Sequence, residues 1–211
     1  MIKVIGLTGS IATGKSTASK YLEALGCTVI DGDVIAREVA EDPRVLRRIG
    51  STFGGKVLDD EGKLRRKKLG ALVFNDEDAL KKLNKIMHPA IRSKIKEQLE
   101  TLKDRSQNQT KNRFQLEKSL NCVVIDGALL IEMNLHPWVD EVWVVAMKKD
   151  EQVRRLMERD GISKTDARKR IEAQMSTEEK KKFADVVLDN SKDPEYLKEQ
   201  IVRELSRLKE Q

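Results

Sequence analysis

The amino-acid sequence predicts an α/β fold in which a five-stranded parallel sheet is flanked by helices. Short apolar runs recur along the 211 residues and are separated by longer stretches of helical character. Strands that are covered on both faces have this continuous apolar composition rather than an alternating one. The first run is followed by a glycine-rich loop, a helix and a second run, which implies a right-handed crossover between parallel strands. The five expected strands are 2–8, 27–30, 122–126, 141–147 and 186–188.

The helices between these strands are predicted from caps and breakers. A first helix over 16–25 should end at Gly26, because glycine suits a helix C-cap. The segment 34–103 is mainly helical, with a polar turn at 59–62 and a helix start at 75–78. It is too long for a simple crossover, so we interpret it as a helical insertion between strands.

Prolines mark further boundaries. Pro89 is expected to start or kink a helix, and its neighbour His88, like His136, precedes a proline and should be extended. The polar stretch 104–120 predicts a surface loop or an extended helix end. Between the fourth and fifth strands and after the fifth, three helices should start at cap signals, which are Ser163, Ser176 and Asp193-Pro194.

Composition limits the class of protein. The chain is 39% apolar and 36% charged, with a formal net charge of +6 that suits a protein handling nucleotides or other polyanions. The densest basic runs, 63–68 and 180–182, are interpreted mainly as solvated helix faces. Cys27 and Cys122 each open an apolar run, so we expect both to be buried thiols without a disulfide framework or metal spacing.

Targeting signals and long apolar segments are not found. The N-terminus begins a strand at once, and no apolar run approaches the length of a bilayer span. We therefore expect a cytoplasmic protein with no membrane partner. A nucleic-acid-binding surface is disfavoured because aromatic residues make up only 4% of the chain and 63–68 contains none.

The strongest motif is G-x-x-x-x-G-K-S, which spans Gly9 to Ser16 between a predicted strand and a helix. Glycines let backbone N–H groups surround phosphate oxygens, and the helix N-terminus favours anions. Lys15 is expected to reach the β- and γ-phosphates of ATP, and the Ser16 hydroxyl to ligate Mg²⁺. The motif predicts a P-loop NTPase fold with a nucleotide contact set of Ala12, Thr13, Gly14, Lys15, Ser16 and Thr17.

Acidic residues follow two of the predicted strands at the edge of the sheet where ligands bind in open α/β folds. Asp31 and Asp33 follow the second strand, where a carboxylate can deprotonate an attacking hydroxyl, hold a metal-bound water or cap the next helix. Asp126 ends the third strand, where P-loop proteins commonly hold Mg²⁺. A strand-end turn remains the alternative for Asp126.

Basic residues cluster between the fourth and fifth strands. Arg155 and Arg159 are four residues apart and share a predicted helix face, and Arg170 lies in the next helix. Such arginines can close over a nucleotide and neutralise transition-state charge. The alternative is surface ion pairing with the acidic residues Glu151, Glu158 and Asp166.

These motifs in this order resemble the dephospho-coenzyme A kinase family over nearly the whole chain. The P-loop is not specific to that family, whereas the His-Pro-x-Ile-Arg run and the C-terminal runs are. The matching segments are 7–17, 31–33, 88–92, 129–132, 154–161, 170–175 and 184–191.

The resemblance implies phosphorylation of the ribose 3′-hydroxyl of dephospho-coenzyme A by ATP, the last step of coenzyme A synthesis. It also implies three parts. These are a nucleotide core over about 1–33, 121–149 and 183–211, a helical coenzyme A domain over about 34–120, and a lid over about 150–182. The expected partners are the two small substrates, with the chain a monomer or weak homo-oligomer.

Residue roles carry over by position. Asp33 matches the proposed catalytic base, and Lys15 and Ser16 match the phosphate and Mg²⁺ ligands. His88 and Arg92 match the acceptor-binding segment, and Asn190 lies in the stretch expected near adenine. The matching lid residues are Arg155, Arg159 and Arg170, of which the first two are expected to be catalytic.

The chain departs from the family pattern at several positions. The family usually has glycine where Ser10 and Ala12 stand, and proline where Ala128 opens the run Ala-Leu-Leu-Ile-Glu132. Arg65 replaces an expected aspartate, and 102–121 is longer than usual. Two alternative functions are a different P-loop nucleoside or nucleotide kinase and a GTPase. A GTPase is disfavoured because 84–87 has Asn-Lys without the aspartate of a guanine-binding motif.

Overall fold

The computed structural model describes residues 2–74, 76–109 and 122–210. The chain divides into two compact units. The core unit consists of Met1–Asp31 and Leu99–Gln211, and the helical unit consists of Gly32–Gln98.

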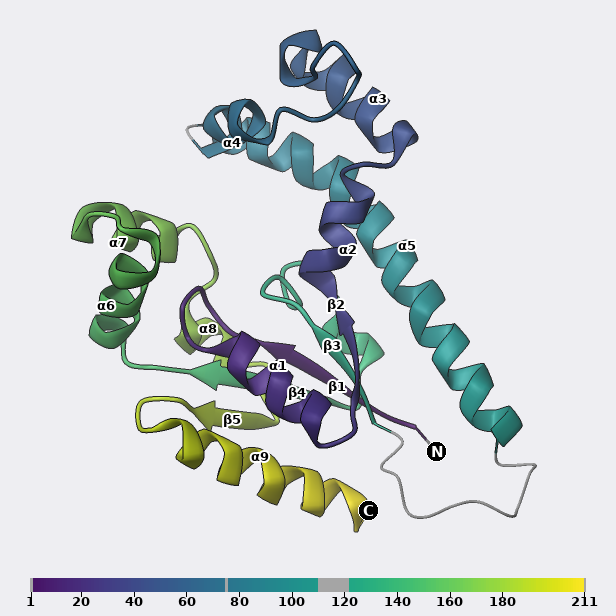
Figure 1. The fold of residues 1–211 in the computed structure, drawn as a ribbon, viewed down its shortest axis with the longest axis vertical. Helices are drawn as coiled ribbons and strands as arrows, with labels where there is room; N and C mark the ends of the chain where they lie inside the picture. The colour runs from purple at the N-terminus through teal and green to yellow at the C-terminus, as the bar shows by residue number, and fades with distance from the viewer. Residues whose placement is uncertain (1, 75, 110–121, 211) are drawn as a thin grey trace. The chain divides into compact units, whose positions relative to one another are not determined.

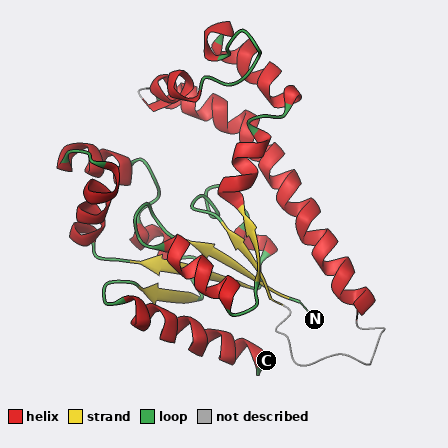
Figure 2. Ribbon diagram, viewed as in Figure 1, coloured by secondary structure: helices red, strands yellow, loops and turns green. Residues whose placement is uncertain are grey.

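The core unit is built on a parallel sheet, whose strands are the yellow arrows in Figure 2, and their order across the sheet is β2-β3-β1-β4-β5. The five-stranded parallel sheet predicted from the sequence is therefore confirmed. Its strands are β1 (Lys3–Thr8), β2 (Thr28–Asp31), β3 (Cys122–Asp126), β4 (Glu141–Ala146) and β5 (Val186–Asp189).

Helices α1 (Lys15–Ala24) and α9 (Pro194–Lys209) cover one face of this sheet (Figure 1). Leu22 of α1 and Ile201 of α9 are fully buried in one cluster with Trp143 of β4. On the opposite face, Gly6 is approached by the side chains of residues in the segment after β3. Both faces of the central strands are thus covered, as their apolar runs predict.

The edge strands differ from the prediction. Val187 of β5 is 44% exposed, and in β2 Thr28 is exposed and only Ile30 is buried. The second strand also begins at Thr28 rather than Cys27, because the Cys27 backbone N–H donates to the Leu22 carbonyl and closes the end of α1. Gly26, with φ +93°, makes this closure possible.

Three helices connect β4 to β5: α6 (Lys149–Asp160), α7 (Lys164–Glu172) and α8 (Thr177–Lys181). The predicted capping box at Ser176 is complete, with Glu179 as its partner, and the Ser163 side chain caps α7. Val153 and Leu156 of α6 pack with residues of α7 in a small core of their own. The cap at Asp193, before α9, is also confirmed.

The helical unit contains α2 (Gly32–Val39), α3 (Pro43–Phe53), the 3₁₀ turn η1 (Gly55–Val57), α4 (Arg66–Phe74) and most of α5 (Glu77–Gln109). The predicted polar turn at 59–62 lies inside a bridge between Leu58 and Leu64. Asp76 accepts hydrogen bonds from the N–H groups of residues 78 and 79, which confirms the predicted helix start.

The helix start expected at Pro89 is wrong, and the alternative expected there, a kink, stays a prediction. Helix α5 passes through Pro89 without ending, and His88 is helical rather than extended. Pro89 lies on an exposed face, where its ring avoids the packed side of the helix. The polar stretch 104–120 begins as an extension of this helix to Gln109, and residues 110–121 lie outside the described part of the chain. His136 also differs from expectation, because it starts the 3₁₀ turn η2 (His136–Trp138).

Candidate nucleotide site

The P-loop joins β1 to α1 and is shaped by internal hydrogen bonds. The Ser10 carbonyl accepts from both the backbone N–H and the side-chain hydroxyl of Thr13, at 3.2 and 2.8 Å. Gly14 has φ +92°, and a Cβ there would lie 2.0 Å from Nδ2 of Asn190. At Gly9 a Cβ would lie 2.6 Å from the Thr13 hydroxyl oxygen. Both motif glycines are therefore required by close packing.

The loop ends in the first turn of α1, which contains no acidic residue. Lys15 begins the helix, Ser16 is exposed and Thr17 is partly buried. The unshared N–H groups and positive dipole end of this helix favour an anion. The local geometry is that of a phosphate-binding site.

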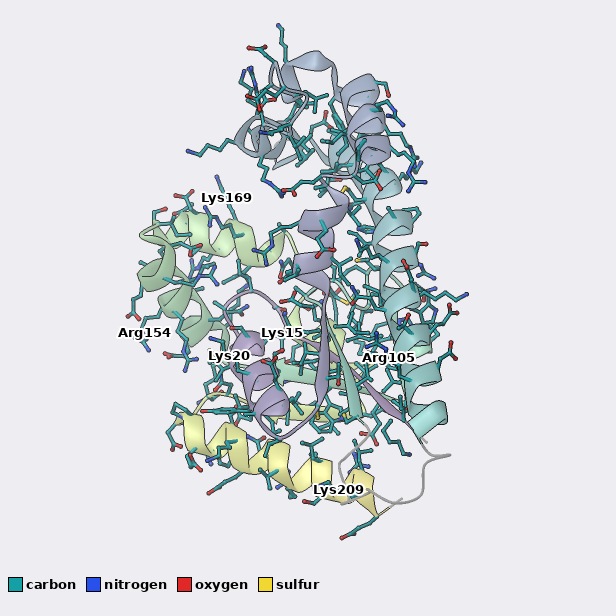
Figure 3. All side chains as sticks on the ribbon, turned by 45° about the vertical axis from the view of Figure 1, so that its right-hand side comes forward. Lys15, Lys20, Arg105, Arg154, Lys169 and Lys209 are labelled. Carbon is teal, nitrogen blue, oxygen red and sulfur yellow. The ribbon has the colours of Figure 1, made fainter. Side chains whose placement is uncertain are left out.

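Lys15 forms an ion pair with Asp126, with 2.5 Å between Nζ and Oδ1 (Lys15 is labelled in Figure 3). Burial raises the pKa of Asp126 above its ordinary value, and the neighbouring Lys15 ammonium partly opposes this effect. Asp31 lies beside Asp126 at the ends of paired strands β2 and β3. The core unit thus brings two of the three predicted acidic residues to one edge of the sheet.

Asn190 holds the P-loop against the end of β5. Its side-chain Nδ2 donates to the Thr13 carbonyl at 2.8 Å, and its backbone N–H donates to the Ala146 carbonyl at 2.9 Å. The side chain is buried and points at Gly14. Asn190 therefore shapes the predicted nucleotide site.

The predicted lid arginines fall into two groups. Arg155 of α6 donates to Glu151 at 3.1 Å, and its Nη1 lies 4.0 Å from the position of a Cβ on Gly14. Arg159 and Arg170 both pair with Asp160, at 2.7 and 2.8 Å.

The alternative interpretation, surface ion pairing, holds for Glu151 and Glu158 but not for Asp166. Hydrogen bonds from Arg154 and Arg155 lower the pKa of Glu151 to about 2. Arg154 lies on the outer side of α6, away from Lys15 (Figure 3). Asp166 instead accepts a hydrogen bond from Ser163. Of the three predicted lid arginines, Arg155 is thus the one for which the structure gives a position beside the P-loop.

The predicted acceptor residues lie in the helical unit. Asp33 lies in the first turn of α2 rather than in a loop before it, where a carboxylate is stabilised by the helix dipole. His88 and Arg92 are four residues apart on α5, so they share one face of that helix.

A cavity of about 580 Å³ opens beside the P-loop. Ser10 and Gln152 contribute to its wall, together with residues of α7 and α8. Ser10 is the P-loop residue that lines it, whereas Lys15 and Asp126 do not.

Comparisons with known proteins identify the family of this chain. The family model described as "Dephospho-CoA kinase" matches residues 3–195. A curated dephospho-CoA kinase from Shouchella clausii is 43% identical over 204 residues, covering 96% of this chain and 97% of that protein. The chain belongs to the dephospho-CoA kinase family.

Further relatives agree along the whole length. A dephospho-CoA kinase from Carboxydothermus hydrogenoformans is 39% identical, with 99% of this chain and 96% of that protein covered. The solved structure of a dephospho-CoA kinase from Campylobacter jejuni is 30% identical and superposes with a TM-score of 0.70, covering 99% of this chain and 98% of that one. In the described part of the chain, no helix is long and apolar enough to cross a bilayer.

Ala12 stands where the dephospho-CoA kinase family usually has glycine. This residue has φ +62°, in the left-handed region that favours glycine. This left-handed backbone conformation explains why glycine is usual at this position in the family. Here the methyl group packs against the small core of α6 and α7, as does Ile11.

Sequence reasoning missed several residues that support the P-loop and its surroundings. Gln152 donates to the Ile11 carbonyl, while Gln174 accepts from the Ile11 N–H at 3.0 Å. Lys180, interpreted from the sequence as part of a solvated face, is fully buried. No local pattern indicates these roles, because each partner lies more than 45 residues away in the sequence.

Proposed function

We propose that this protein transfers the γ-phosphoryl group of ATP to the ribose 3′-hydroxyl of dephospho-coenzyme A. The observation that carries the proposal is a complete P-loop, with Lys15 starting α1, in a chain matched over nearly its full length by dephospho-CoA kinases. The donor half of the site lies in the core unit, and the predicted acceptor residues lie in the helical unit.

Lys15 would exchange one anionic partner for another during binding. In the structure its ammonium group is held by the buried carboxylate of Asp126. An arriving phosphate offers more negative charge at the same helix N-terminus. Asp126 therefore keeps Lys15 at the site before ATP arrives, and the ammonium then neutralises charge that develops on the transferred group.

The residues at this edge fit a magnesium ion bound together with nucleotide. Magnesium prefers oxygen ligands and usually binds through one or two protein groups plus substrate phosphates. The exposed Ser16 hydroxyl and the carboxylates of Asp126 and Asp31 supply such oxygens. When bound, the ion would neutralise phosphate charge.

Asp33 would orient and deprotonate the acceptor hydroxyl. Its carboxylate lies in the first turn of α2, directly after β2 in the chain, and would accept the proton of the attacking hydroxyl. His88 and Arg92, on one face of α5, would bind the acceptor, and the guanidinium group suits its phosphate groups.

The segment from α6 to α7 would act as the lid. Arg155 and Arg159 would leave their carboxylate partners for the transferring phosphoryl group, and Arg170 would bind the nucleotide. Closure with both substrates bound would exclude water and limit ATP hydrolysis. Asn190 would contact the adenine end while it holds the P-loop.

The proposed reaction is tested by measuring ATP turnover with and without dephospho-coenzyme A. We expect strong stimulation by this acceptor and little by nucleoside monophosphates. The opposite preference would assign the chain to another nucleoside or nucleotide kinase activity. With this activity we expect the protein to be cytoplasmic.

The base is tested with Asp33→Asn, which keeps the size of the side chain and removes its charge. We expect normal ATP binding and a loss of turnover on the order of 10² or more, the range of general base catalysis. Asp31→Asn is the comparison variant, since this residue ends β2 and its carboxylate is proposed as a magnesium ligand. Near-normal turnover in Asp33→Asn, with a large loss in Asp31→Asn that a higher Mg²⁺ concentration does not restore, would transfer the role of base to Asp31.

A further inference from the structure

Residues Ser10 to Thr13 form a turn in the first half of the P-loop. The Thr13 N–H donates to the Ser10 carbonyl at 3.2 Å, which closes a β-turn with Ile11 and Ala12 at its centre. Ala12 has φ +62°, whereas Ile11 is not among the described residues with a positive φ. A positive φ at the second central residue alone defines a type II turn. Such a turn favours glycine at that position, and here it contains an alanine.

The peptide between Ile11 and Ala12 decides the type of this turn. A type I turn suits alanine better, because φ of its second central residue is negative. Between the two types the central peptide turns over by roughly 150–170°. The peptide is planar and trans, so its carbonyl and its N–H point in opposite directions and both reverse when it turns over.

Gln152 of α6 holds this peptide by its carbonyl. The side-chain amide of Gln152 donates to the Ile11 carbonyl at 2.5 Å, and only 3% of the residue is exposed. Turning the peptide over would remove the acceptor from this buried amide, and a buried donor without a partner is costly. The observed hydrogen bond therefore favours the type II orientation over the type I orientation.

The Ala12 N–H lies on the other side of the same peptide and points away from α6. The side chains of Ile11 and Ala12 pack against the small core of α6 and α7, which covers the outer side of the turn. The N–H is thus directed to the inner side of the P-loop, where backbone N–H groups surround phosphates in this motif. In the type I orientation, the Ile11 carbonyl oxygen would point there instead and would repel a phosphate.

A second glutamine binds the neighbouring peptide. The Ile11 N–H, which belongs to the Ser10–Ile11 peptide, donates to Oε1 of Gln174 at 3.0 Å. Gln174 follows α7 and is half-buried. It anchors the start of the turn, but its peptide is not the one that reverses between the two turn types. The two glutamines therefore differ in what their removal should do.

We infer that Gln152 is a positioning residue that keeps the Ile11–Ala12 peptide in its type II orientation and so presents the Ala12 N–H to the phosphates of ATP. This inference rests on the proposed function. Gln152 acts through Ile11 without contacting the nucleotide. Because this chain has alanine where glycine would adopt the turn without cost, the conformation depends on the support from α6.

The test measures the Kd for ATP, without acceptor, in variants of the two glutamines. Gln152→Met keeps the length of the side chain and removes the donor. Gln174→Met is the matched control, because it removes a hydrogen bond to the same residue but from the other peptide. Both substitutions are repeated in an Ala12→Gly background, since glycine adopts a positive φ without support.

We expect Gln152→Met to raise the Kd for ATP about five- to thirtyfold, the preference of alanine against a left-handed conformation. The kcat at saturating ATP should change less than about twofold, because bound ATP selects the competent turn. In the Ala12→Gly background the same substitution should raise the Kd less than about twofold. Gln174→Met should change the Kd by the same factor in both backgrounds.

If Gln152→Met does not fold, Gln152→Asn, which withdraws the amide by one methylene, should give the same pattern. A wild-type Kd for ATP in the Gln152 variant overturns the inference, and so does a rise of equal size in the two backgrounds. The proposed function fails by a different result, which is a wild-type protein that binds ATP without acceptor-stimulated turnover. In that case the Kd values still decide the role of Gln152.

Discussion

At Gly14 the backbone conformation and the packing each exclude a side chain. The residue has φ +92°, and a Cβ would collide with the Asn190 amide. We predict that Gly14→Ala lowers the free energy of unfolding and raises the KM for ATP at least about tenfold, because the Asn190 contact with Thr13 is lost. Denaturant unfolding and ATP titration of turnover measure the two effects.

Gly26 supplies a matched control for this prediction. Its φ is +93°, but no atom lies within 4 Å of the position a Cβ would take. Gly26→Ala should therefore show only the backbone cost, about 1–2 kcal/mol, with an unchanged KM for ATP. If both variants had the same KM, the collision with Asn190 would not matter for nucleotide binding.

The role of a single residue can be predicted from the sequence when its interactions are with nearby residues in the chain. Lys15 and Ser16 were predictable because one local motif fixes both the turn and the helix that follows. Lys180 was not, because its burial depends on Glu132, which is 48 residues away. A basic run is usually solvated, and only the packed structure shows that one member is not.

At the scale of elements, α6 presents adjacent arginines to different surroundings. Arg155 lies beside Gly14, whereas Arg154 pairs with Glu151 and Glu158 on the outer side of the helix. We predict that Arg155→Ala lowers kcat on the order of 10³, the effect of removing a transition-state arginine. Arg154→Ala should change kcat less than about twofold, since exposed ion pairs contribute little. Steady-state kinetics at saturating substrates distinguish the two variants.

The contact between β4 and α9 gives a prediction on pH. Glu141 binds the Arg207 guanidinium through two hydrogen bonds of 2.9 and 2.7 Å and accepts a third from Trp143. Burial raises the pKa of Glu141, but the bonds from Arg207 and Trp143 outweigh it, so the pKa lies below the ordinary value of 4.5. The stabilisation is then fully present above about pH 4.5 and is lost as the pH falls through the lowered pKa.

Glu141→Gln should therefore destabilise the protein by about 1–2 kcal/mol at pH 7 and by less at pH 3.5. Urea unfolding at the two pH values measures the difference. Glu195→Gln, which breaks an exposed pair with Lys198 on the same helix α9, should have almost no effect at either pH. An equal loss for Glu141→Gln at both pH values would contradict the assignment.

Helix α5 shows why some element boundaries resist prediction. A proline usually ends or kinks a helix, so the sequence around Pro89 favoured a helix boundary there. The 33-residue helix passes through it because hydrogen bonds on both sides outweigh the one that proline cannot make. The strands were predicted more closely because each is a short apolar run between clear breakers.

For the whole molecule, the division into two units gives different expectations for the two substrates. The five strands and the P-loop follow from local patterns, whereas the order of the strands and the extent of the helical unit, Gly32–Gln98, depend on contacts between distant segments. The proposed sites divide in the same way, with Lys15 in the core unit and Asp33, His88 and Arg92 in the helical unit. Each substrate should consequently stabilise mainly the unit that binds it.

We predict that ATP at about a hundred times its Kd slows amide hydrogen exchange in the core unit, by an amount equivalent to about 2.7 kcal/mol for amides that exchange only on its unfolding. Exchange within Gly32–Gln98 should change little with ATP alone. Dephospho-coenzyme A should slow exchange around Asp33 and along α5 near His88 and Arg92. Hydrogen-exchange mass spectrometry resolves these peptides. Protection of the helical unit by ATP alone, with none added by dephospho-coenzyme A, would contradict the assignment of acceptor binding to that unit.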